Sequence, residues 1–148
     1  MKKFSFGLET LLRYRKSLEE KELEELSRIQ ASVQRERERA EELRTKARET
    51  SIEAARRRGE FAQEEELVWY YRYLDRLETE IQKSQERLAS LEQEIQKKRA
   101  EVIEASKKKK ILDTLKGRKE KEFISALDRQ EEQEVGDLVV TRFPREKT

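Results

Sequence analysis

The sequence predicts an all-α fold, a two-helix antiparallel coiled coil in which the second helix is longer than the first. The chain has 148 residues and is 46% charged and 34% hydrophobic, with 4 Gly and 1 Pro, a composition typical of long helices rather than of a globular core. A second observation is a glycine, Gly59, between two apolar series. The third is an apolar repeat with one residue at every seventh position: Leu67, Leu74, Ile81, Leu88, Ile95 and Val102.

The second apolar position of these heptads is less regular. Two polar residues, Ser84 and Lys98, interrupt a series that otherwise consists of Tyr70, Leu77, Leu91 and Ala105. Most other residues of the segment are charged or amide side chains. A seven-residue apolar repeat stays exposed to water until another helix covers it, so this seam requires a partner helix.

The first helix is predicted over residues 4–57. Ser5 is a candidate N-cap, and Glu9 suits the positive end of the helix dipole. Its apolar face begins with Phe4, Leu8, Leu11, Leu12 and Leu18, and after a slip of register continues with Leu26, Ile29, Val33, Ala40, Leu43, Ala47 and Ala54. The alanines make this face narrow, so the partner helix has to supply bulk.

A turn is predicted over residues 58–62. Gly59 suits the position after a helix C-terminus, and Arg56, Arg57 and Arg58 suit the negative end of the dipole. One continuous helix with a coiled-coil discontinuity is the alternative. In a hairpin, opposite residues have numbers that add to roughly 121, which places small residues opposite large ones, for example Ala40 opposite Ile81.

The second helix is predicted over residues 63–135, followed by a tail over 136–148, and the whole chain as one coiled-coil domain. Gly136 weakens the helix and Pro144 ends regular structure. The N-terminus is expected beside Gly117, so residues 118–135 project past the first helix. An uncovered apolar face there is a candidate docking surface, and it consists of Ile111, Leu112, Leu115, Phe123, Ile124 and Leu127.

Several functional classes are excluded by composition. Without His or Cys, the chain lacks the commonest general base, the commonest metal ligands and the thiol nucleophile. We therefore expect no enzyme, no metal, no cofactor and no small-molecule ligand. With 35 basic and 33 acidic residues, the net charge of +2 indicates no general attraction to nucleic acid. No stretch is apolar enough to span a membrane or to act as a signal peptide, which predicts a cytoplasmic protein.

Two features are candidates for binding another protein. An aromatic group at residues 69–73 holds the only Trp, and such residues are enriched at interface hot spots; alternatively the rings cover the turn and pack on Phe61. A basic segment over residues 97–121 could meet an acidic protein surface or a phosphate backbone, or be a solvated face. The residues assigned to partner binding are Trp69, Tyr70, Tyr71, Tyr73, Leu77, Lys107, Lys108, Lys109, Lys110, Leu112, Leu115, Phe123 and Leu127.

Three parts of the sequence together form a recognisable pattern. The N-terminal part is Phe4, Leu8, Leu11, Leu12 and Arg15, and the start of the second helix is Tyr70, Tyr73, Leu74, Leu77 and Ile81. The C-terminal part is the run ILDTLK at 111–116, then Glu132-Gln133-Glu134, Asp137-Leu138 and Arg142-Phe143. These three parts resemble the flagellar export protein FliJ family. Gly136 departs from the family pattern, which usually has a helix former there.

The resemblance implies a non-enzymatic stalk, similar to the gamma subunit of rotary ATPases, at the cytoplasmic face of the membrane at the flagellar base. The implied partners are the hexameric export ATPase, whose ring assembly and activity it promotes, the membrane export gate and substrate-specific export chaperones. Residues 1–18 and 107–127 would enter the ATPase ring, and the aromatic group would contact the gate. The alternatives are a coiled-coil scaffold that self-associates through residues 67–127 and, less favoured, a nucleic-acid-binding hairpin.

Overall fold

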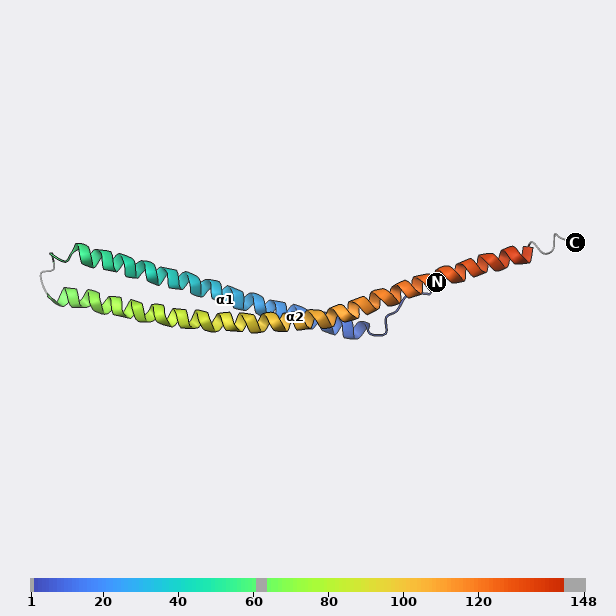
Figure 1. Cartoon of the computed structure of the whole chain (residues 1–148), viewed down its shortest axis with the longest axis horizontal. Coiled ribbons are helices and arrows are strands. Elements are labelled where there is room, and N and C mark those ends of the chain that lie inside the picture. Colours follow the sequence, from blue (N-terminus) through green and yellow to red (C-terminus); the bar gives the residue numbers. More distant parts are fainter. Residues whose placement is uncertain (1, 61–63, 143–148) are drawn as a thin grey trace. The chain divides into compact units, whose positions relative to one another are not determined.

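The computed structural model describes residues 2–60 and 64–142. Within these ranges the chain forms two α-helices and no strand: α1, Glu9–Arg56, has 48 residues and α2, Glu64–Arg142, has 79 (Figure 1). The all-α prediction with a longer second helix is thus confirmed. Residues 57–60 form a turn after α1, and the end of the predicted turn, at residues 61 and 62, lies outside the described residues.

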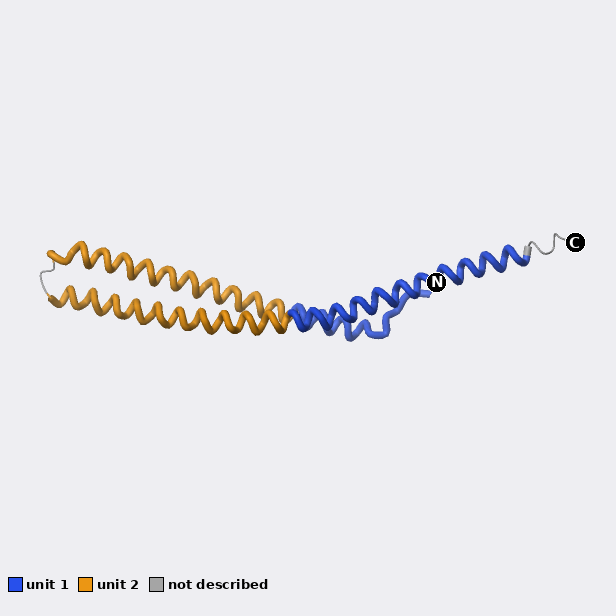
Figure 2. Tube along the Cα trace, viewed as in Figure 1, with its two compact units in different colours: residues 1–20, 103–148 blue, residues 21–102 orange. Residues whose placement is uncertain are grey.

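The chain divides into two compact units (Figure 2). The hairpin unit comprises residues 21–102, and the terminal unit comprises residues 1–20 and 103–148. Each helix contributes to both units. In the hairpin unit α1 and α2 run side by side in opposite directions (Figure 2), as the prediction of a hairpin rather than one continuous helix required. That the whole chain is a single domain stays a prediction.

The core of the hairpin unit follows the predicted heptads. Both heptad positions are buried or half-buried throughout residues 67–102, and Leu77 and Ile95 are the most deeply buried of the apolar ones. Val33 and Ala40 are buried on α1. The Ser84–Glu36 hydrogen bond joins residues whose numbers add to 120, close to the predicted register. The spacing of apolar residues therefore predicted the buried face, and the Ser84–Glu36 hydrogen bond agrees with the predicted register.

The terminal unit has its own core between the two helices. Leu12 of α1 is fully buried, and Leu112 of α2 is 9% exposed. Beside them, the Lys116 ammonium lies 2.9 Å from the Glu9 carboxylate. Glu9 is in the first turn of α1, as expected.

The predicted start of the first helix, with Ser5 as its N-cap, is wrong. Residues 2–6 are not helical, and α1 begins at Glu9, where the first backbone hydrogen bonds run from Glu9 N–H to Phe6 O and from Leu12 N–H to Leu8 O. Gly7 disfavours a helix at this point. The non-helical segment also allows the Phe4 ring to lie 5.7 Å from the Phe123 ring. The chain's own N-terminal segment therefore reaches further along α2 than Gly117.

The predicted end of the second helix, at residue 135, is also wrong. α2 continues through Gly136 to Arg142, so residues 136–142 of the predicted tail are helical. A helical glycine costs only about 1 kcal/mol relative to alanine, and the residues around it are compatible with a helix. The remainder of the predicted tail, which includes Pro144, lies outside the described residues. All side chains of residues 128–141 are exposed.

Candidate interaction surfaces

The aromatic cluster, Trp69, Tyr70, Tyr71 and Tyr73, lies in the first turns of α2. The rings of Trp69 and Tyr73 are stacked, with centroids 5.6 Å apart and an interplanar angle of 4°, because residues four apart share one face of a helix. The Tyr70 ring meets Trp69 edge-on at 5.3 Å. Trp69 is nonetheless 60% exposed and Tyr71 is 52% exposed. The cluster thus presents rigid aromatic surface to solvent.

Tyr70 connects this cluster to the end of α1. It is half-buried at a heptad position, as expected, and its hydroxyl accepts a 3.1 Å hydrogen bond from Arg57 Nη1. This hydrogen bond raises the pKa of Arg57. The alternative packing of the rings on Phe61 falls outside the described residues. Stacking within the cluster and the bond to Arg57 hold the rings in place before any partner arrives.

Ser84, the first polar interruption of the heptads, is fully buried and makes a specific contact across the hairpin. Its hydroxyl donates a 2.7 Å hydrogen bond to Glu36 Oε1, which also accepts from Arg87 Nε at 3.0 Å. Bonding of the charged carboxylate, first to Ser84 and then to Arg87, holds the pKa of Glu36 below its usual value. The hydrogen bond of Ser84 therefore helps to fix the register of the two helices, although Ser84 interrupts the apolar series.

Lys98, the second interruption, is the centre of an ion-pair network. Its ammonium lies 2.6 Å from Glu25, 2.7 Å from Glu101 and 2.9 Å from Glu22. The hydrogen bonds that the Lys98 ammonium donates to Glu101, Glu25 and Glu22, in that order of importance, raise the pKa of Lys98. Sequence reasoning identified both interruptions but missed their partners. The predicted register was sufficient to identify these partners. It places Glu36 within about one residue of the position opposite Ser84, and Glu22 within about one residue of the position opposite Lys98.

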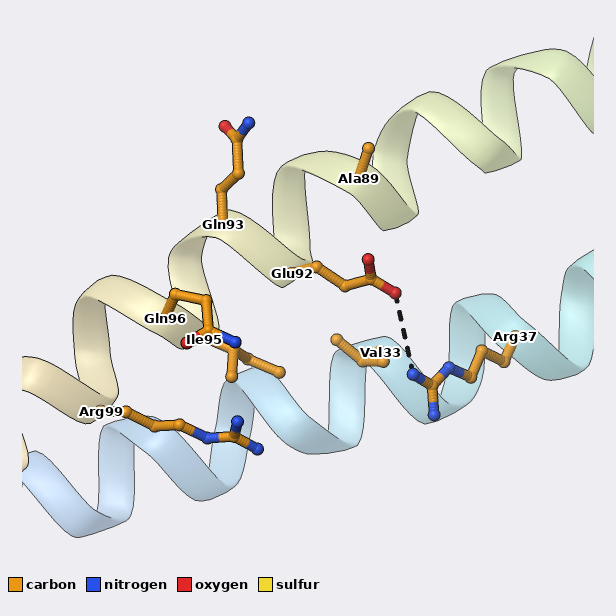
Figure 3. A pocket seen from close by; sticks show the side chains of 8 residues that line it. All are labelled: Val33, Arg37, Ala89, Glu92, Gln93, Ile95, Gln96 and Arg99. Atoms are coloured by element: carbon orange, nitrogen blue, oxygen red, sulfur yellow. Dashed lines mark ion pairs between the residues drawn. The ribbon is translucent and has the colours of Figure 1, made fainter.

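A further ion pair crosses the hairpin beside the apolar core. Arg37 of α1 and Glu92 of α2 are 3.7 Å apart, and Val33 and Ile95 project between the helices next to them (Figure 3). The shallow hollow at this point is lined by apolar residues, among them Ala89, and by polar side chains, among them Gln93, Gln96 and Arg99. Because the hollow is open to solvent, it fits a solvated flank of the hairpin better than a ligand pocket.

The basic run at residues 107–110 is divided between the two sides of α2. Lys107, Lys108 and Lys110 are exposed, whereas Lys109 is half-buried and pairs with Glu19 at 2.9 Å. Hydrogen bonds from Ser106 and then Lys109 lower the pKa of Glu19. Three of the four lysines therefore face solvent, and the fourth connects α2 to α1.

The apolar residues assigned to partner binding are mostly covered. Leu77 and Leu112 are buried, so the helices would have to separate before either touched a partner. Leu115, Phe123 and Leu127 are half-buried. Sequence reasoning missed several large apolar side chains that are exposed on α2, and their lack of a heptad partner on α1 is the signal that could have found them. They are Ile103, Val135, Leu138, Val139 and Val140, and the expected face members Ile111 and Ile124 are exposed as well.

The electrostatics of the described residues are dominated by ion pairs and charged hydrogen bonds. Every glutamate with a shifted pKa in the described part of the chain has it lowered, and the largest cause is a hydrogen bond to a neighbouring side chain. Across residues 2–60 and 64–142, no group of three or more Asp, Glu, His or Cys could hold a metal ion.

Neither α1 nor α2, over the residues described, contains an apolar stretch long enough to cross a membrane.

Comparison with known proteins supplies one match. The sequence model of a protein family described as "Flagellar FliJ protein" matches residues 4–148, which is nearly the whole chain. No match was found to a curated protein or to a solved structure.

Proposed function

Because the chain belongs to the FliJ family, whose members are non-catalytic components of flagellar protein export, we propose that it is a stalk-like coiled coil that binds the hexameric export ATPase. It promotes assembly and activity of the ATPase ring and connects the ring to the membrane export gate and to export chaperones. It acts in the cytoplasm, at the inner face of the membrane. Flagellar assembly, and therefore motility, depends on it.

The observation that carries the proposal is the set of exposed lysines on α2 in the terminal unit, together with the family match over residues 4–148. This unit holds the start of α1 and an α2 segment with exposed Lys107, Lys108 and Lys110. Exposed surface lysines attract an acidic protein surface at long range and accelerate its association. We assign these three lysines to the contact with the ATPase.

The aromatic cluster supports a second contact, which we assign to the export gate. Trp69 and Tyr71 are exposed, and stacking of Trp69 on Tyr73 limits the side-chain entropy that binding would cost. An exposed, pre-ordered aromatic surface is the kind of site that supplies most of the energy of a protein interface. The cluster lies in the hairpin unit, so it and the exposed lysines belong to different compact units.

The test is the rate of ATP hydrolysis by the cognate flagellar export ATPase, titrated with this protein. We expect stimulation that saturates near one chain per six ATPase chains, as a single stalk in a hexameric ring requires. The triple variant Lys107→Ala, Lys108→Ala, Lys110→Ala should need at least several-fold more protein for half-maximal stimulation, because three long-range attractions are lost.

The matched control removes three exposed lysines of the hairpin unit instead, with Lys21→Ala, Lys46→Ala and Lys97→Ala. It changes the net charge equally and should stimulate like the unmodified protein. Absence of stimulation by a fully helical protein would contradict the stalk proposal. Equal weakening by both triple variants would show a general charge effect and contradict the assignment of the contact to the terminal unit.

A further inference from the structure

The terminal unit contains an apolar hollow between the chain's N-terminal segment and α2. The contact of the Phe4 ring with the Phe123 ring, at 5.7 Å, holds the segment against α2, so that the segment forms one wall. The volume of the hollow, about 630 Å³, lies within the range of binding sites. Leu8 is 41% exposed and the other apolar lining residues are half-buried, so the chain itself does not cover this lining. The apolar lining consists of Phe4, Phe6, Leu8, Leu115 and Phe123.

A second hollow, of about 550 Å³, lies on α2 next to the first. Leu115 lines both, so the two hollows adjoin. The other large apolar side chain of the second hollow is Ile111, which is 68% exposed. We call the two hollows together the terminal groove, and its apolar lining is that of the first hollow with Ile111 added.

The charged lining of the terminal groove is mostly basic. Glu122 pairs with Lys119 at 3.7 Å, so the other four charged side chains, all cationic, determine the charge that a partner meets. The wider segment of α2 at residues 103–125 is basic as well, with eight Lys or Arg and four Asp or Glu. The groove therefore attracts an acidic partner. The charged lining residues are Lys3, Lys107, Lys110, Arg118, Lys119 and Glu122.

The combination of apolar and basic lining restricts the occupant. A phosphate backbone would match the cations but would leave the apolar side chains exposed to water. A purely apolar segment would cover the apolar side chains but would remove water from the cations without supplying a counter-charge. An amphipathic protein segment with an apolar side chain between carboxylates satisfies both kinds of lining.

We infer that the terminal groove binds an acidic amphipathic segment of the export ATPase, with an apolar side chain of that segment in the hollow that Leu8 and Leu115 line. Carboxylates of the same segment meet Lys107, Lys110 and Arg118. The inference rests on the function proposed above, since it names the kind of ATPase segment that the terminal unit contacts. It adds an apolar anchor and the chain's own N-terminal segment to a contact that was assigned to exposed lysines alone.

The two kinds of lining should act at different steps of binding. Exposed charges mainly change the association rate, because they attract the partner before contact is made. An apolar side chain buried at the centre of an interface mainly changes the dissociation rate, because it acts only after contact. Binding kinetics can therefore separate the apolar anchor from the lysines.

The experiment is surface plasmon resonance of the full chain on the immobilised cognate export ATPase. Leu8→Gln with Ile111→Gln should accelerate dissociation roughly tenfold and change association little, because each hollow loses one apolar side chain. Lys107→Ala with Lys110→Ala should instead slow association several-fold at low salt. That second difference should shrink as salt is added, since salt screens the attraction.

The matched control is Leu23→Gln with Ile52→Gln, which changes one Leu and one Ile of the hairpin unit. These side chains are 46% and 67% exposed, so the control removes about as much exposed apolar surface as Leu8→Gln with Ile111→Gln does. The control should dissociate like the unmodified chain. Circular dichroism verifies that each variant is helical.

Four outcomes would overturn the inference. The folded Leu8→Gln, Ile111→Gln variant could dissociate at the unmodified rate, which would leave the proposed function standing with a contact through charge alone. The control could dissociate equally fast, which would place the apolar contact outside the terminal groove. The chain could bind single-stranded DNA as tightly as the ATPase at the same salt, which would assign the basic lining to a phosphate backbone. Finally, absence of binding by the unmodified, folded chain would contradict the proposed function and this inference with it.

Discussion

Ser84 of α2 and Glu36 of α1 are joined by a 2.7 Å hydrogen bond in the middle of the hairpin unit, and Ser84 is completely buried. A lone polar group at a coiled-coil seam lowers stability but specifies register, since a shift of either helix would leave it unbonded. Arg87 strengthens the contact by donating to the same carboxylate oxygen. The interruption of the apolar heptads is therefore where the alignment of the two helices is specified.

Ser84→Ala should lower the free energy of unfolding by about 1 kcal/mol, since a buried hydrogen bond is lost while Glu36 keeps Arg87. Urea unfolding followed by circular dichroism measures the difference. Ser90→Ala, at an exposed position of the same helix, is the control and should change stability little. Equal effects of the two substitutions would mean that the Ser84–Glu36 bond contributes nothing to stability.

Stability should fall in acid. The pKa of Glu36 is lowered in the folded state by Ser84 and Arg87, so its contribution is fully present above the unfolded value near 4.5 and is lost as the pH falls through the lower folded pKa. Glu36→Gln should flatten the dependence of the urea midpoint on pH below about pH 5. The exposed Glu42→Gln is the control; an unchanged slope in Glu36→Gln would contradict the linkage.

Lys98→Met should lower stability at low salt, because Glu22, Glu25 and Glu101 then repel one another without the ammonium between them. The difference from the unmodified protein should shrink as sodium chloride is added, since salt screens both the attraction and the repulsion. Thermal unfolding at several salt concentrations measures this. A difference independent of salt would indicate a packing effect instead.

Phe4→Ala should release the N-terminal segment from α2, because the 5.7 Å ring contact with Phe123 is lost. Hydrogen exchange of the amides of residues 3–8 should become faster, and an aromatic pair of this kind is worth about 1 kcal/mol. Tyr14→Ala, which removes an exposed ring, is the control. Unchanged exchange in Phe4→Ala would show that the ring contact does not hold the segment.

Replacing Trp69, Tyr71 and Tyr73 by Ala should weaken binding to the cytoplasmic part of the export gate at least tenfold, because rigid exposed rings supply most interface energy. Calorimetric titration measures binding, and circular dichroism should show unchanged helicity. Val68→Ala, at an exposed aliphatic side chain next to the cluster, is the control. Unchanged binding in a folded triple variant would exclude the cluster from the contact.

The sequence alone was enough to predict two long helices, because seven-residue spacing from Leu67 to Val102 and the break near Gly59 are local, periodic features. It also predicted that Tyr70 and Leu77 face inward. The helix ends were predicted less well. α1 starts at Glu9 rather than at Ser5, and the contact of Phe4 in the preceding segment with Phe123 joins residues too far apart in the chain for a local pattern to predict.

Tertiary structure decided the meaning of the polar and exposed residues. Ser84 and Lys98 were interruptions in the sequence, and only the packing of α2 against α1 made them partners of Glu36 and Glu22. Likewise, Ile103 and Leu112 are both apolar residues of α2, but α1 covers only Leu112, and Ile103 stays exposed. Periodicity determined which side chains lie on one face of a helix, whereas the partner determined which faces are buried, because burial and ion pairing depend on residues distant in sequence.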